Sequence, residues 1–196
     1  GTLIVNGTVG DVALSGTGIL GGSGTVGDVT TVSGSVISPG NSPDTLTFAN
    51  WAPAGGTIID WEVLNAGPSR VAGTDYDTIR VTGNLNLAGV TSVNRITIKV
   101  TSLDTILTDG PALNFNSPEG GGEMVRTFTL MTIEGNILNQ SGSISDLFAF
   151  DFNDEHSIPL AVYRHVIQTG DGASVGAWNL AAAASCGDIL IQINDD

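Results

Sequence analysis

The segment GTVGDVALSG, residues 7–16, returns as GTVGDVTTVSG at residues 24–34, and this repetition decides the fold class. Glycines separate short groups of β-branched residues in both copies, which predicts short strands joined by tight turns. The matched positions keep one constant spacing and are Gly7 and Gly24, Val9 and Val26, Asp11 and Asp28, and Val12 and Val29. A repeat of about 17–18 residues is typical of one coil of a β-solenoid, in which each coil buries its inner face against its neighbours.

Residues 1–50 are therefore predicted to form a short, Gly-rich β-solenoid with coils of about 17–18 residues. The stretch SVISPGNSPDTLTF, residues 35–48, ends the repeat with two turn signals followed by an alternating strand. We expect residues 51–196 to be a β-rich, sandwich-like region that caps the solenoid. Its expected strands are TIIDWEVL (57–64), YDTIRVTGNLNLAGV (76–90), RITIKVTSL (95–103), RTFTLMTI (126–133), LFAFDF (147–152), LAVYRHVI (160–167) and DILIQIN (188–194). The predicted fold class is all-β.

Composition and charge exclude several classes of partner. The chain has 196 residues, 41% of them hydrophobic, which is enough material for a folded core. Twenty acidic residues against six basic ones give a net charge of −14, and no Lys or Arg precedes Arg70. We expect no nucleic-acid partner, because cationic side chains must neutralise the phosphates. We also expect no membrane insertion, because no apolar run approaches the ~18 residues of a spanning helix.

The stretches GTGILGGSGTVGDV (16–29) and SGSVISPGNSPDTLTF (33–48) resemble the autotransporter passenger-associated β-strand repeat, a Gly-rich coil followed by a Pro-Gly-Asn-Ser-Pro turn. Later stretches are similar to secreted surface proteins that carry this repeat and often end in a Pro-Glu-Pro sorting tail. Those stretches are WAPAGGTIIDWEVLNAG (51–67), GTDYDTIRVTGNLNLAG (73–89) and GAWNLAAAASCGDILIQIN (176–194). The sequence departs from the pattern at Asp44, where Gly is usual, at Asp11 and Asp28, where Asn is common, and in having no sorting tail after Asp196.

This resemblance implies an architecture and a location. It implies right-handed β-helix coils and an extracellular protein on a bacterial cell surface. It supplies no catalytic residues, since passenger and matrix proteins of this kind share none.

Few residues suggest catalysis. His156 and His165 have no nucleophile or second ligand at a recognisable spacing. Two pairs of carboxylates could serve as the acid and base of a polysaccharide-cleaving enzyme. These pairs are Asp60 with Glu62, and Asp75 with Asp77. Such alternating acids more often form a solvated strand face or cap a turn, so we expect no enzyme.

Three tryptophans and one cysteine have ordinary structural explanations. Trp51, Trp61 and Trp178 could form a sugar-binding platform, but large aromatic side chains more often fill cores, and we expect them there. Cys186 is the single cysteine, so the chain forms no internal disulfide.

Calcium is the one ligand that the acidic residues suggest, and we expect no other cofactor. The stretch DFNDE, residues 151–155, places oxygen ligands at Asp151, Asn153 and Glu155, but His156 stands where a calcium loop requires Gly. In consecutive coils, Asp11 and Asp28 would stack about 5 Å apart. Two such carboxylates require a shared proton, a bridging cation or hydrogen-bond donors from the turns.

The N-terminal strand suggests a function. Residues 1–34 contain neither Lys nor Pro, the residues that usually protect an edge strand against pairing. We therefore expect self-association, with the subunit interface at Thr2, Leu3, Ile4, Val5 and Val9. A head-to-tail contact that does not close would give a filament, formed by coil stacking or by donation of residues 2–9 as a strand.

The alternative is a binding module. The chain would then be the C-terminal portion of a longer, adhesive surface passenger. Further coils upstream of residue 1 in the secreted product would distinguish this alternative from a filament subunit.

Overall fold

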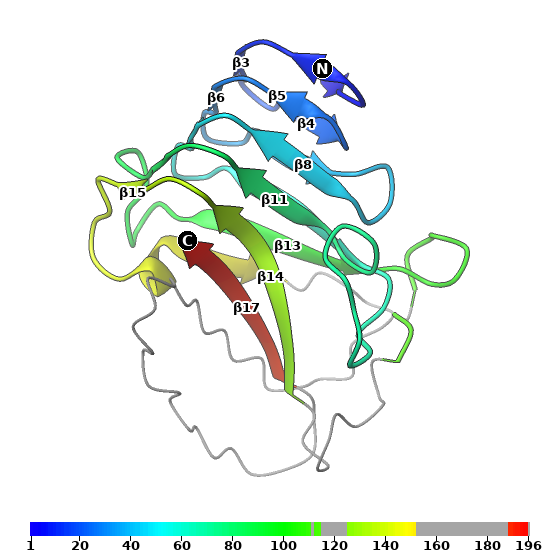
Figure 1. Cartoon of the computed structure of the whole chain (residues 1–196). Helices are drawn as coiled ribbons and strands as arrows, with labels where there is room; N and C mark the ends of the chain where they lie inside the picture. Colours follow the sequence, from blue (N-terminus) through cyan, green and yellow to red (C-terminus); the bar gives the residue numbers. More distant parts are fainter. Residues whose placement is uncertain (111, 115–124, 152–187, 196) are drawn as a thin grey trace.

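The computed structural model describes residues 1–110, 112–114, 125–151 and 188–195, and nearly all regular structure in them is β. Three sheets run along the molecule (Figure 1). Sheet A contains β1 (Thr2–Ile4), β4 (Ile19–Gly22), β7 (Val36–Pro39), β10 (Ile58–Val63), β13 (Ile96–Ser102) and β16 (Phe148–Asp151). Sheet B contains β2 (Thr8–Val9), β5 (Thr25–Val26), β8 (Thr45–Phe48), β11 (Thr78–Val81), β14 (Val125–Ile133) and β17 (Asp188–Asp195). Sheet C contains β3 (Val12–Ala13), β6 (Val29–Thr30), β9 (Trp51–Ala52), β12 (Leu85–Asn86) and β15 (Ile137–Leu138), and the 3-10 helix η1 spans Ile144–Leu147.

The chain visits sheets A, B and C in turn. Coil 1 contains β1, β2 and β3; coil 2 contains β4, β5 and β6; and the same order continues through coil 5, which ends with β15. β16 and β17 add a sixth strand to sheets A and B. Every pairing between named strands is parallel. The predictions of an all-β chain and of a β-solenoid are confirmed.

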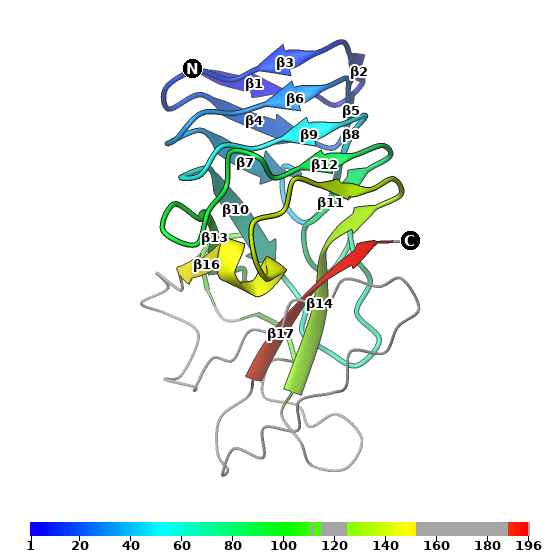
Figure 2. The same cartoon turned by 90° about the vertical axis from the view of Figure 1, so that its left-hand side faces the viewer.

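The coils lengthen along the chain. In sheet A, Thr2 pairs with Ile19 and Ile19 pairs with Val36, so the first two coils are equally long. The next two coils, from Val36 to Ile58 and from Ile58 to Thr97, are each longer than the coil before. The strands lengthen as well, from 3 residues in β1 to 7 in β13, so the solenoid widens away from the N-terminus (Figure 2).

The change expected after residue 50 takes the form of longer coils within the same sheets. β8 and β9, which flank this position, pair directly with β11 and β12 of the next coil. The described strands from residue 51 onward therefore continue the solenoid and build no separate pair of sheets. Six of the seven expected strand segments contain strands of the structure, and the seventh, residues 160–167, lies outside the described residues.

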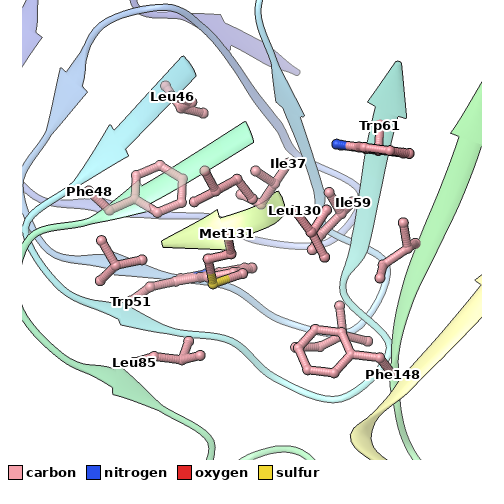
Figure 3. Close-up of a cluster of buried hydrophobic side chains, with 14 of the residues drawn as sticks. Ile37, Leu46, Phe48, Trp51, Ile59, Trp61, Leu85, Leu130, Met131 and Phe148 are labelled. Carbon is pink, nitrogen blue, oxygen red and sulfur yellow. The ribbon is translucent and has the colours of Figure 1, made fainter. Parts of the chain in front are cut away.

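Ladders of apolar side chains fill the interior. Alternate residues of each strand point inward, and the in-register pairing stacks them from coil to coil. Buried stacks line each sheet: Leu20, Ile37, Ile59 and Ile98 in sheet A; Val26, Phe48, Val81 and Ile133 in sheet B; and Val29, Trp51 and Leu85 in sheet C. Figure 3 shows part of this core. Trp51 and Trp61 are both fully buried, as expected, whereas Trp178 lies outside the described residues.

The two buried tryptophans provide a matched test of the core. The Trp61 indole N–H donates to the Asp77 carbonyl, whereas the Trp51 indole nitrogen has no hydrogen-bond partner among the described residues. Trp61→Phe should therefore lower the free energy of unfolding by about 1 kcal/mol more than Trp51→Phe does, because only Trp61→Phe leaves a buried acceptor unpaired. Urea unfolding of the two variants measures this difference. Equal losses of unfolding free energy in the two variants would show that the hydrogen bond from Trp61 to the Asp77 carbonyl contributes nothing.

Candidate interaction surface at the first coil

Coil 1 forms one end of all three sheets. β1, β2 and β3 are the end strands of sheets A, B and C, and in the described part of the chain only coil 2 pairs with them. The outer edges of these strands, with the corner residues 5–7 and 10–11, are called the coil-1 face. Unpaired N–H and C=O groups on an open edge favour pairing with another chain.

The apolar interior is also open at the coil-1 face. Leu3 is 41% exposed, whereas Leu20, its partner in coil 2, is fully buried. Ile4, which alternates with Leu3 and stands in the outward-facing row of sheet A, is 49% exposed. Val9 is only partly buried against the core, and its partner Val26 is fully buried. Side chains that would lie inside a longer solenoid thus reach its surface here.

The five residues expected at the subunit interface differ from one another in their exposure. Thr2, Leu3 and Ile4 are exposed on β1, and Val9 is partly buried on β2. Val5 is 6% exposed, and its N–H donates to the Gly21 carbonyl of coil 2 at 2.8 Å, so it belongs to the solenoid core. The interface itself stays a prediction.

A ladder of Asp and Asn side chains marks the corner between sheets B and C. Its rungs, each directly before a strand of sheet C, are Asp11, Asp28, Asn50, Asn84 and Asn136. Asp11 Oδ1 accepts the Asp28 N–H at 2.9 Å, Asn50 Oδ1 accepts the Asn84 N–H at 2.7 Å, and Asn84 Oδ1 accepts the Asn136 N–H at 3.0 Å. Each of these side chains thereby ties its coil to the next.

A glycine directly before the Asp or Asn of a coil permits the side chain of the preceding coil to approach the backbone this closely. A Cβ on Gly27 would lie 2.3 Å from Asp11 Oδ1, and one on Gly83 would lie 2.4 Å from Asn50 Oδ1. Ala49 occupies the equivalent position in coil 3, and there the Asn50 side-chain amide donates to Asp28 Oδ1 at 2.7 Å. The recurring Gly-Asx dipeptide was the sequence signal for this corner.

The ladder also explains how Asp11 and Asp28 coexist. Of the three expected solutions, the structure shows hydrogen-bond donors from the turns: the backbone N–H of Asp28 for Asp11, and the Asn50 amide for Asp28. Among the described residues, no group of three or more His, Cys, Asp or Glu side chains could hold a metal ion.

The second calcium candidate lies at the edge of the described structure. Asp151 is exposed at the end of β16, where it pairs in register with Lys99 of β13. Asn153 and Glu155 lie outside the described residues. A calcium ion at this position remains a hypothesis.

The acidic pairs have separate structural partners. Asp60 accepts a hydrogen bond from the Lys99 ammonium at 3.2 Å, linking β10 to β13. Burial raises the pKa of Glu62; the neighbouring Asp60 charge adds to this effect, and Lys99 opposes it. Asp75 accepts the Val71 N–H at 2.7 Å and so closes the loop before β11.

Asp77 departs from the expectation of a solvated face or a simple turn cap. Its side chain is fully buried, with one oxygen accepting the Asp44 N–H at 3.0 Å and the other accepting the Glu62 N–H at 2.9 Å. It thereby joins the segment before β8 to β10. Burial raises its pKa to about 8, against the opposing effect of the two backbone hydrogen bonds.

A shallow groove lies on the outer side of sheet C. Its volume is about 320 Å³, and the neighbouring strands that form it are seen in Figure 2. The groove runs beside the corner ladder. Its lining residues are Asp28, Val29, Thr30, Asn50, Trp51, Ala52, Asn84, Asn86 and Leu138.

Comparisons with known proteins leave the family open. No family model, no curated protein and no solved structure matches the chain. No helix in the described residues is long and apolar enough to cross a membrane. His156, His165 and Cys186 lie outside the described residues.

Substitutions at Asp28 test the corner ladder. Asp28→Ala removes the acceptor of the Asn50 amide and should lower the free energy of unfolding by about 1 kcal/mol. Asp28→Asn keeps an acceptor and removes one of two stacked charges, so it should stay within about 0.5 kcal/mol of the parent. Urea unfolding at pH 7 compares the two variants. Equal losses would show that the contact contributes nothing.

Asp77 should impose a pH dependence on stability. A folded-state pKa of about 8, above the ordinary value of 3.8, means that the unfolded chain loses its proton first as pH rises. The free energy of unfolding should therefore fall between about pH 4 and pH 8, by up to about 1.4 kcal/mol per pH unit. Asp77→Asn should flatten this slope, whereas Asp109→Asn, at an exposed site, should not. Chemical unfolding at pH 5, 6 and 7 measures the slopes, and a parallel Asp77→Asn profile would contradict the assignment.

Proposed function

We propose that this chain is a structural protein of the extracellular surface, a subunit whose copies associate head to tail into a filament through the coil-1 face. The observation that carries the proposal is the open end of the solenoid. The end strands of the three sheets, β1, β2 and β3, have outer edges there that pair with no other described strand. These edges surround apolar side chains whose counterparts in coil 2 are fully buried. A second copy would pair these edges and cover the open core.

The opposite end of the described solenoid supports a head-to-tail contact. β16 and β17 are the end strands of sheets A and B, and they lie far from β1 and β2 in both views (Figures 1 and 2). A contact between two different ends of one molecule gives an open fibre when the rotation from copy to copy does not close into a ring, and the proposed filament is of this kind. The extracellular, bacterial location in this proposal rests on the sequence resemblance alone.

Charge sets the conditions for assembly. A net charge of −14 makes each copy repel the next at low ionic strength. Salt shortens the range of this repulsion to about 8–10 Å near physiological ionic strength. Assembly should therefore require salt or divalent cations.

A lysine on the open edge should block assembly. Leu3→Lys places a charge where a second copy would bury an apolar side chain, whereas Val93→Lys makes the same kind of change at a side chain that is 94% exposed in a loop. Electron microscopy and light scattering in salt should show filaments for the parent and for Val93→Lys, and dispersed particles for Leu3→Lys. Filaments of unchanged abundance from Leu3→Lys would refute the role of this face.

The groove on sheet C favours a second candidate function, the C-terminal portion of an adhesive passenger. Its lining surface is mostly apolar, with a few amide and carboxylate side chains, a combination typical of ligand-binding sites. The mass of the secreted product distinguishes the two candidates. If further coils of the same kind precede residue 1, the coil-1 face is covered within one polypeptide, and the adhesive passenger is favoured.

A further inference from the structure

The groove on sheet C lies between two rows of side chains that run along the stack of coils (Figure 2). The first row belongs to the corner ladder and consists of Asp28, Asn50 and Asn84. The second row holds the outward-facing residues of the sheet C strands, which are Thr30, Ala52, Asn86 and Leu138. Val29 and Trp51 lie between the rows with their side chains buried in the core. The groove therefore follows the stacking direction across coils 2 to 5.

Hydrogen bonds hold both rows in place. In the corner row, the Asn50 amide donates to Asp28 Oδ1 at 2.7 Å, and Asn50 Oδ1 accepts the Asn84 N–H at 2.7 Å. In the second row, Asn86 Oδ1 accepts the Ala88 N–H at 3.2 Å and the Asn139 amide at 2.9 Å. A ligand would meet walls that are already ordered, which lowers the entropic cost of binding.

Four polar groups of the lining residues have no hydrogen-bond partner among the described residues. They are Asp28 Oδ2, the Thr30 hydroxyl, and the side-chain amide nitrogens of Asn84 and Asn86. The two amide nitrogens donate, the carboxylate oxygen accepts, and the hydroxyl does both. A ligand that satisfies this set must itself both donate and accept hydrogen bonds.

The rest of the lining narrows the ligand class. Its surface is mostly apolar, so a suitable ligand also carries apolar carbon. A hydrocarbon would leave the four polar groups unpaired. An anion would meet the Asp28 carboxylate, and no Lys or Arg is among the described residues that line the groove. A peptide strand would need open backbone edges, whereas this face belongs to strands that pair with each other.

We propose that the groove binds an uncharged glycan chain, which lies along the stack of coils. Sugar rings combine hydroxyl groups, which donate and accept, with apolar C–H faces. Neighbouring strands are about 4.8 Å apart, so coils 2 to 5 offer a path of roughly 14 Å. The groove volume of about 320 Å³ suits a short stretch of such a chain.

This inference goes beyond the proposed filament and does not depend on the coil-1 face. It gives a ligand class to the groove that favours the second candidate function. A subunit within a filament could carry the same site, because the groove lies on the outer side of sheet C and not at either end of the described solenoid.

An NMR titration of the isotope-labelled chain at low ionic strength tests the site. The probes are linear hexasaccharides of glucose, mannose and xylose, with a galacturonate hexamer as the acidic counterpart and a glucosamine hexamer as the cationic one. At least one neutral probe should shift the amide signals of β6, β9 and β12, and the galacturonate hexamer should shift none of them. If no neutral probe shifts these signals, or if either charged hexamer binds more tightly than every neutral one, the inference is overturned.

A matched pair of leucine substitutions locates the binding site. Ala52→Leu fills the groove from its second row and should raise the dissociation constant about tenfold or more. Ala13→Leu makes the same change in the same outward-facing row, one coil before the lining residues, and should leave the constant within about twofold of the parent. Both side chains face outward, so the melting temperatures should stay near that of the parent. Equal binding by Ala52→Leu and the parent would place the ligand elsewhere and overturn the inference.

Asn86→Asp tests the polar contacts with little change in shape. It keeps an oxygen for the Ala88 N–H and the Asn139 amide and replaces the unpartnered amide nitrogen by a carboxylate oxygen. The loss of this donor should raise the dissociation constant for the neutral glycan about fivefold. An unchanged constant would contradict the proposed contacts. Failure of glycan binding in these experiments would leave the filament proposal untouched, since electron microscopy of Leu3→Lys tests that proposal separately.

Discussion

Each coil of this solenoid depends on the coil beside it. Strands of two or three residues, such as β2 and β3, are too short to hold their backbone in place alone. Parallel pairing with the next coil satisfies their N–H and C=O groups and stacks the apolar side chains into ladders. The close approach at the corners, between Gly27 and Asp11 for example, follows from the same requirement, because strands in register bring the turns into register too.

In-register stacking constrains the strands and leaves the connections free. The step from Ile58 to Thr97 in sheet A is more than twice as long in sequence as the step from Thr2 to Ile19, yet the order of sheets does not change. The added length provides new internal contacts. Asp77, which follows one of the longer connections, turns its carboxylate inward and holds backbone N–H groups on both sides. A carboxylate in this position stabilises local structure and makes overall stability sensitive to pH.

The sequence was informative where the repeat is regular. The matched residues of coils 1 and 2 predicted the coil length and the solenoid, because nothing interrupts the constant spacing between Thr2 and Val36. The later coils have alternating strands too, but longer connections between the strands remove the constant spacing. Without that spacing, the sequence of residues 51–196 predicted a separate region. The burial of Asp77 had no local signal, since it depends on backbone from two other segments. The corner ladder, by contrast, could have been found from its recurring Gly-Asx pairs.

Because the coils lengthen along the chain, the entropic cost of closing the loop between paired strands also rises from the first coil to the last. Pairing β1 with β4 closes a short loop, from Thr2 to Ile19, whereas pairing β14 with β17 joins Val125 to Asp188, which lie more than three times as far apart in sequence. Each doubling of a flexible loop adds about 0.6 kcal/mol of closure entropy, so the last closure costs roughly 1 kcal/mol more than the first. Contacts between residues close in sequence also form fastest. The narrow end is therefore the natural nucleus, and during synthesis its strands would be available before those of the wide coils that follow.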